Sequence, residues 1–143
     1  MKDIAFSLEN IEYADLTNDK EDEAIIHISV QYGGSAKSGL FYVYTLDNNK
    51  PKKLWYIESG YGAEGELKKV YAENNKLIVE LFGNNKFIEN TYKFKFPNQK
   101  VIPKNLCCPT NFTKFSFKWN GEKFALDGKP KLFGYDWKKE MNK

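Results

Sequence analysis

The chain has 143 residues, of which 41% are hydrophobic, 16% aromatic and 29% charged. This length and composition fit one globular domain over residues 1–143 and exclude an intrinsically disordered chain. No run approaches the roughly 18 apolar residues of a membrane-spanning helix, and the first residues lack the apolar core of a signal peptide. The many aromatic residues, with 10 Gly and 5 Pro, favour strands over helices, so we expect an all-β fold.

All 22 basic residues are lysines. Because lysine lacks the forked guanidinium that reads guanine or phosphate, we expect no sequence-specific binding to nucleic acid. The net charge of +3 is unevenly spread, since residues 1–46 hold 3 Lys and 8 acidic residues and residues 47–143 hold 19 Lys and 11. The lysines alternate with apolar residues, which is typical of the solvated side of strands; a polyanion-binding face is the alternative.

Period-two alternation and turn residues predict an antiparallel meander of about eight strands, arranged as a sandwich, an open barrel or a blade. The predicted strands cover residues 4–14, 23–32, 40–46, 53–58, 67–73, 76–82, 86–96, 112–119 and 122–126. Hairpin turns are expected at 47–51, at Asn74-Asn75 and at Asn120-Gly121. Residues 97–111 read as a long loop, and the Lys-rich tail 129–143 as irregular chain with one short turn of helix.

A run of acidic and polar residues at 15–23, which we call the acidic loop, separates the first two predicted strands. Oxygen-bearing side chains at alternating positions, closed by a carboxylate just before a strand, can converge on one hard cation such as Ca²⁺. Lys20 stands where a glycine would ease such a turn. The alternative is a solvated acidic turn whose side chains accept hydrogen bonds from neighbouring backbone groups. The candidate ligands are Asp15, Thr17, Asp19, Glu23 and the main-chain carbonyl of Glu21.

Residues 15–25 resemble the D-L-x-x-D-x-x-x-E-A-[IV] segment of FG-GAP-like and VCBS-type repeat modules, in which a calcium-binding loop precedes a strand. Three further pieces follow a shared order: I-x-F-x-x-x-N-I-x-Y at 4–13, the loop 60–67, and C-C-P-T at 107–110 before aromatic strands. Together they are similar to uncharacterised exported or lipid-anchored bacterial proteins that carry a G-D-x-A-x-G-G-L loop and a C-C-P-[ST] motif. Tyr61 and Glu66 depart from the first of those motifs.

The resemblance implies an extracytoplasmic location, in the periplasm or at the cell surface, with the export signal missing from this chain. It implies no reaction. From the residues alone, the three glycines at 60–65 predict a tight structural turn, because no helix N-terminus follows that would make the loop a phosphate cradle.

Cys107 and Cys108 are adjacent, so they can close a strained eight-membered disulfide ring that acts as a redox-sensitive clip, or remain two separate thiols. The only histidine, His27, lies on a distant predicted strand. We therefore expect neither a zinc site nor a Cys-His nucleophile.

Aromatic residues on successive strands are expected to fill much of the core, because long aliphatic side chains are few. We expect Tyr42, Tyr44 and Tyr61 to lie at the surface and to contact a partner.

These observations predict a non-catalytic, exported bacterial domain that binds a protein or envelope component, with the acidic loop either calcium-stabilised or purely structural. A periplasmic inhibitor or immunity-type protein is one form of this hypothesis. The rival is a metal-dependent hydrolase in which an ion at Asp15, Asp19 and Glu23 polarises a substrate; it requires an open coordination position inside a cleft.

Overall fold

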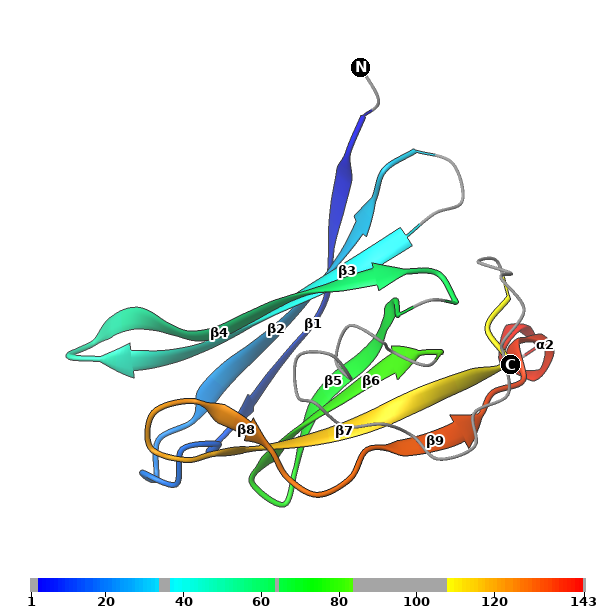
Figure 1. The fold of residues 1–143 in the computed structure, drawn as a ribbon. Helices are drawn as coiled ribbons and strands as arrows, with labels where there is room; N and C mark the ends of the chain where they lie inside the picture. Colours follow the sequence, from blue (N-terminus) through cyan, green and yellow to red (C-terminus); the bar gives the residue numbers. More distant parts are fainter. Residues whose placement is uncertain (1–2, 34–36, 64, 84–107, 143) are drawn as a thin grey trace.

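The computed structural model describes residues 3–33, 37–63, 65–83 and 108–142 (Figure 1). These residues form two antiparallel sheets and no closed barrel, which confirms the all-β prediction. The first sheet has four strands in chain order, each antiparallel to the next. They are β1 (Ala5–Ala14), β2 (Glu23–Gln31), β3 (Lys37–Asp47) and β4 (Lys50–Tyr61).

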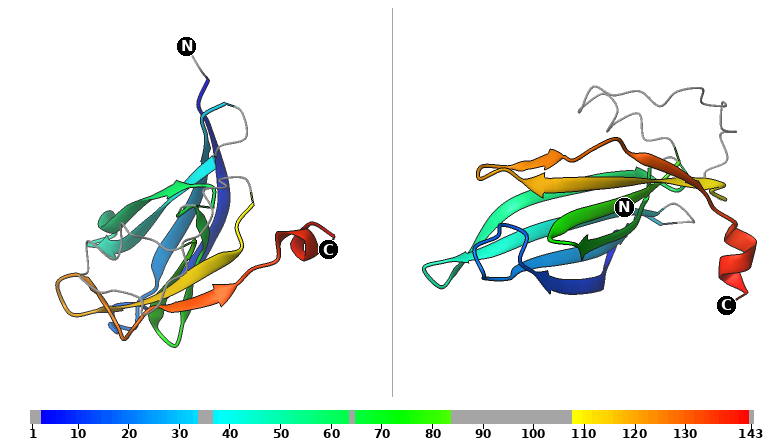
Figure 2. Two further views of the ribbon diagram at one scale, coloured as in Figure 1. Left: turned by 45° about the vertical axis from the view of Figure 1, so that its right-hand side comes forward. Right: turned by 90° about the horizontal axis from the view of Figure 1, so that it is seen from below.

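The second sheet has five strands. Both β8 and β9 pair with β7, β8 with the C-terminal half and β9 with the N-terminal half. Figure 2 shows the two sheets as two layers, with the short helix α2 (Trp137–Met141) at one end. The strands are β5 (Leu67–Glu73), β6 (Lys76–Phe82), β7 (Asn111–Trp119), β8 (Phe124–Leu126) and β9 (Lys131–Gly134).

Asparagine pairs form two of the hairpin turns. Asn48 and Asn49 join β3 to β4 with φ values of 51° and 62°, and Asn74 and Asn75 join β5 to β6 with φ values of 52° and 60°. Two successive positive φ angles match the right-handed twist of the flanking strands, and asparagine tolerates that backbone better than most residues. Pro51 lies within β4, which accepts a proline because β4 is an edge strand of its sheet.

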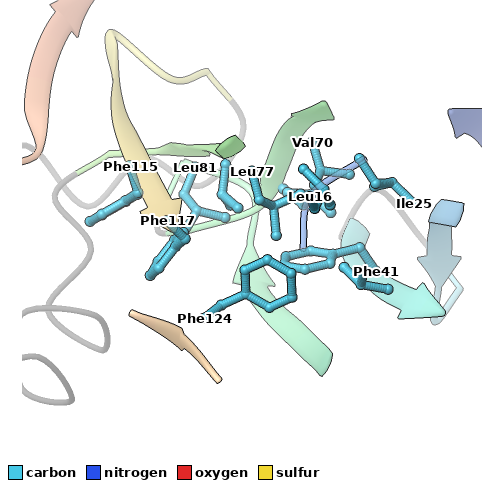
Figure 3. Close-up of a cluster of buried hydrophobic side chains, with 12 residues drawn as sticks. Leu16, Ile25, Phe41, Val70, Leu77, Leu81, Phe115, Phe117 and Phe124 are labelled. Carbon is cyan, nitrogen blue, oxygen red and sulfur yellow. The ribbon is translucent and has the colours of Figure 1, made fainter. Parts of the chain in front are cut away.

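The core lies between the sheets. Phe41 of the first sheet and Phe115 and Phe117 of the second are fully buried. Trp55 of β4 bridges the layers, since its ring centroid lies 5.5 Å from that of Phe41 and 4.8 Å from that of Phe117. Figure 3 shows buried side chains from both sheets meeting in this cluster. Most of the core is therefore aromatic or aliphatic and comes from alternate positions of each strand.

The strands agree with the sequence prediction in most places. The predicted strand 86–96 and residues 97–107 of the predicted loop lie outside the described residues. The turn after β7 is longer than predicted, because Asn120 holds it through hydrogen bonds from the backbone N–H groups of Glu122 and Lys123 (both 2.9 Å). The tail forms the expected turn of helix, and also β9, which was not predicted.

The glycine loop carries the chain from one sheet to the other. Backbone hydrogen bonds join Gly60 N–H to Gly65 C=O (3.0 Å) and Gly65 N–H to Phe82 C=O (2.7 Å). Gly62 and Gly65 have φ values of 51° and 101°, which glycine adopts without strain. The described part of the loop is therefore held by its own backbone, as a structural turn is. Within the described residues, the structure has no helix long and apolar enough to cross a bilayer.

Candidate functional site

The carboxylate of Glu23 anchors the acidic loop to the first sheet. Its side chain is fully buried at the start of β2. Oε2 accepts hydrogen bonds from the backbone N–H groups of Leu16 (2.6 Å) and Thr17 (3.2 Å). Oε1 accepts from the hydroxyls of Thr17 (3.0 Å) and Thr45 (3.3 Å). Four charge-assisted hydrogen bonds thus offset the cost of burying this carboxylate and tie the loop to β3.

Asp15 organises the exposed part of the loop. Its carboxylate accepts hydrogen bonds from the backbone N–H groups of Asn18 (2.7 Å), Asp19 (3.2 Å) and Lys20 (2.9 Å). Asp19 accepts in turn from the N–H of Glu21 (2.9 Å). Asn18 and Lys20 have φ values of 62° and 70°, so Lys20 holds a left-handed backbone without being glycine.

The carboxylates of Asp15, Asp19 and Glu23 each offer one oxygen within 4.8 Å of the others, a spacing that can hold a cation. Each of them also accepts hydrogen bonds from the chain, so positive ends of N–H or O–H dipoles already point at these carboxylates. Thr17 and Glu21 belong to this internal network as donors. Hydrogen bonds from the chain therefore hold each of these three carboxylates in place.

A surface depression lies elsewhere, at the end of the second sheet beside α2. None of the acidic-loop residues lines it, so the carboxylates are not arranged around this cleft. The lining residues are Lys68, Phe82, Phe112, Gly134, Tyr135, Asp136, Lys139 and Glu140. The ammonium of Lys68 is already engaged, because it lies 2.9 Å from a Glu80 oxygen and 4.5 Å from the centre of the Phe112 ring.

Glu80 is the centre of a polar network on the outer face of the second sheet, the face turned away from the core. It accepts hydrogen bonds from the Tyr71 hydroxyl (2.6 Å) and from Lys68 (2.9 Å). Burial raises the pKa of Glu80, but these hydrogen bonds and the charges of Lys68 and Lys114 outweigh burial and hold the pKa below its ordinary value. Burial and the bond to Glu80 raise the pKa of Tyr71. Charged side chains on this face therefore partner one another.

The outer face of the first sheet is different. Cross-strand partners share a face of a sheet, so the register places the following side chains together, away from the core. We define this outer face by Phe6, Leu8, Ile11 and Tyr13 of β1, Ile26 and Ile28 of β2, Tyr42 and Tyr44 of β3, and Tyr56 of β4. Phe6, Leu8 and Tyr13 are 66%, 62% and 66% exposed, which is unusual for large apolar side chains of one strand.

The tyrosines of β3 and β4 contact one another on this outer face. The ring centroid of Tyr42 lies 4.9 Å from that of Tyr56 and 5.8 Å from that of Tyr44. Tyr61, at the far end of β4, pairs with Ser38 of β3. Its ring centroid lies 5.7 Å from that of Tyr32. Of the tyrosines predicted to be at the surface, Tyr61 is exposed, and Tyr42 and Tyr44 are half-buried by their neighbours.

Sequence reasoning missed the apolar side chains of β1. Phe6 and Leu8 have one parity along the chain, and Ile11 and Tyr13 the other. They nevertheless share a face, because a β-bulge shifts the register between Leu8 and Asn10. This change of parity within one apolar strand was the signal that a bulge was present.

The remaining candidate residues from the sequence are the histidine and the two cysteines. His27 is half-buried in β2; burial lowers its pKa, and the nearby charge of Glu9 opposes that effect. Cys108 is disulfide-bonded, and Cys107 lies outside the described residues. Among the described residues, Cys108 does not belong to the cluster of side chains that could hold a metal ion.

Comparison of the chain with protein-family models, with curated proteins and with solved structures gave no match. The geometry of these surfaces is therefore the basis for inferring function.

Proposed function

We propose that the chain is a non-catalytic binding domain that recognises a protein partner through the outer face of the first sheet. The observation that carries this proposal is where the exposed apolar side chains gather. Of the ten large hydrophobic side chains that are exposed in the described residues, seven are on the strands of the first sheet and two on those of the second. Five of the seven lie on the outer face defined above, namely Phe6, Leu8, Ile11, Tyr13 and Tyr56. Large apolar side chains gathered on one face mark an interaction surface, because water-facing surfaces seldom keep them.

The chemistry of the face fits a protein. Tyrosine and phenylalanine are enriched at protein interfaces, where a ring supplies large contact area with few rotatable bonds. Tyr32 and Tyr56 also donate hydrogen bonds to the carboxylate of Glu58 (both 3.3 Å), so polar groups border the apolar centre. An apolar centre with a polar border is the usual anatomy of such an interface.

The cell envelope is part of the same proposal, supported by the resemblance to exported bacterial proteins. This location is tested by fractionating cells that make the natural protein and detecting the protein in each fraction by immunoblotting. Recovery in the cytosolic fraction alone would contradict the envelope location and leave the binding surface untouched.

The binding surface is tested by capture with matched variants. The wild-type protein, the outer-face double variant Tyr13→Ser/Tyr56→Ser and a control, Leu132→Ser on β9, are immobilised and exposed to envelope extract. Leu132 is 43% exposed on the second sheet, so the control also removes exposed apolar surface. We expect a protein in the extract to be captured by the wild type and by the control, but not by the outer-face variant. Capture that survives in all three contradicts the proposal.

We propose that the acidic loop is a structural element of this domain, held by Glu23 and Asp15. The melting temperature of chelator-treated protein is measured as calcium is added. The proposal expects no shift at millimolar calcium, because N–H and O–H donors already use the carboxylates. A shift that Asp19→Asn abolishes would instead establish the calcium-stabilised form.

A further inference from the structure

The two edge strands of the first sheet are protected to different degrees. An unpaired strand edge recruits other strands, and proteins suppress this with lysine, proline and bulges. The β4 edge begins with three lysines and a proline, Lys50, Pro51, Lys52 and Lys53. The β1 edge has neither lysine nor proline anywhere from Asp3 to Asp19, and it carries only the bulge at Glu9 and the acidic side chains of Glu9 and Glu12. In the described part of the chain, no strand pairs with the free side of β1.

The two sides of β1 present different chemistry. One side belongs to the outer face, with Phe6, Leu8, Ile11 and Tyr13 exposed. The other side carries Glu9 and Glu12, which accept hydrogen bonds from the Ser29 hydroxyl (2.7 Å) and the Ala72 backbone N–H (3.3 Å). Among the described residues, neither carboxylate has an ion-pair partner. The acidic loop, which holds four more exposed or half-buried acidic side chains, follows directly.

We propose that β1 takes up an extended segment of a partner protein as a fifth strand, and that lysine or arginine alternates with apolar side chains in that segment. This inference rests on the proposed function and specifies its partner. Successive side chains of an added strand alternate between the two sides of the sheet. Apolar side chains of the segment then lie beside Phe6, Leu8, Ile11 or Tyr13, and the intervening basic ones lie beside Glu9 and Glu12.

Charge argues against a second copy of the chain as the added strand. Antiparallel pairing of two β1 strands would bring the carboxylates of Glu9 and Glu12 from both copies to the same strand pair, with no lysine between them. Like charges on neighbouring strands are destabilising, whereas a basic segment neutralises the same carboxylates.

The test uses a synthetic fluorescent peptide of about nine residues, the length of one strand, in which valine and lysine alternate. One control peptide has glutamate in place of lysine, and a second has the same composition with the lysines in one block. Affinity is measured by fluorescence anisotropy, and backbone amide exchange by mass spectrometry. The alternating basic peptide is expected to bind at least about tenfold more tightly than either control and to slow amide exchange in residues 5–14.

The variant Glu9→Gln/Glu12→Gln keeps both hydrogen-bond acceptors and removes both charges. It is expected to weaken binding of the basic peptide by about threefold to tenfold, whereas Leu132→Ser leaves it unchanged. Equal affinity for the basic and acidic peptides overturns the inference, as does the absence of binding at about 1 mM. Unchanged exchange of the β1 amides at saturation overturns it too.

The two proposals fail separately. A captured partner that is lost from Tyr13→Ser/Tyr56→Ser, but whose binding leaves the β1 amides unprotected, sinks strand addition and keeps the outer-face proposal. Capture that ignores every first-sheet variant sinks the proposed function. Sedimentation that shows a dimer dispersed by Leu8→Lys would make the second copy the occupant and overturn the basic segment.

Discussion

The outer faces of the two sheets are covered in contrasting ways. On the second sheet, Glu80 is held by Lys68 and Tyr71, and Lys114 approaches Glu73 at 3.4 Å. On the first sheet, Phe6 and Tyr13 project into water with two thirds of their surface exposed. Both sheets bury their inner faces in the same core, so the difference is not a requirement of folding. The contrast supports the proposal that the outer face of the first sheet binds a partner.

The largest expected effect lies in the network of the second sheet. Replacing Glu80 with Ala leaves the Tyr71 hydroxyl and the Lys68 ammonium without their acceptor in a mostly buried place. We expect the free energy of unfolding to fall by about 2–4 kcal/mol, measured by urea denaturation. Glu80→Gln keeps an acceptor and should lose less. A loss below about 1 kcal/mol in Glu80→Ala would show that this network does not stabilise the face.

The pH dependence of stability tests the same network of Glu80 and Tyr71. Because the pKa of folded Glu80 lies below its ordinary value of 4.5, its contribution to stability is present above pH 4.5 and is lost as pH falls through the folded pKa. The raised pKa of Tyr71 adds a contribution that is present below pH 10.0 and is lost as pH rises through its folded pKa. Urea denaturation across pH should show that the free energy of unfolding changes less with pH in Glu80→Gln than in the wild type, in both the acid and the alkaline range. Identical pH profiles for the two proteins would contradict the assignment.

A smaller effect is expected at the rim of this network. The side chains of Lys114 and Glu73 are 29% and 51% exposed, so water screens their attraction. Lys114→Ala should lower the free energy of unfolding by about 0.2–1 kcal/mol, and less at high salt. The measurement is urea denaturation at two salt concentrations. The Lys114 ammonium also lies 5.8 Å from the centre of the Tyr71 ring, so a loss that does not depend on salt would mean that this ring contact carries the effect.

The smallest effect on stability is expected on the outer face of the first sheet. Phe6→Ser and Tyr13→Ser remove side chains that contribute little burial, so each should change the free energy of unfolding by less than about 0.5 kcal/mol. Circular dichroism during thermal unfolding checks this. A loss of more than about 1.5 kcal/mol would show that these side chains serve the fold, as packed apolar side chains do.

Much of the fold follows from local chemistry in the sequence. The Asn-Asn pairs and the alternation around them place β3 to β6, because a turn with two positive φ angles is decided by the residues within it. β9 was missed, since Lys131–Gly134 is exposed along its whole length and depends on its distant pairing with β7. An exposed strand without alternation has no local signal.

The candidate surfaces were predictable only in part. Alternation at Ile4, Phe6 and Leu8 predicted a strand, but a pattern of this kind does not say whether a second layer covers its apolar side. Tyr61 is exposed, as the sequence predicts, whereas Tyr42 and Tyr44 are half-buried by their neighbours. The acidic loop left two interpretations open, because ion binding and backbone capping use the same carboxylates at the same spacing.

Hydroxyl-radical footprinting of the protein alone and bound to its captured partner tests the central claim most directly, because it measures the accessibility of individual side chains. The account predicts that partner binding protects Tyr13 and Tyr56 on the outer face of the first sheet and leaves Leu132 and Phe133 of β9 as reactive as before. Protection of the β9 residues with Tyr13 and Tyr56 unchanged would contradict it.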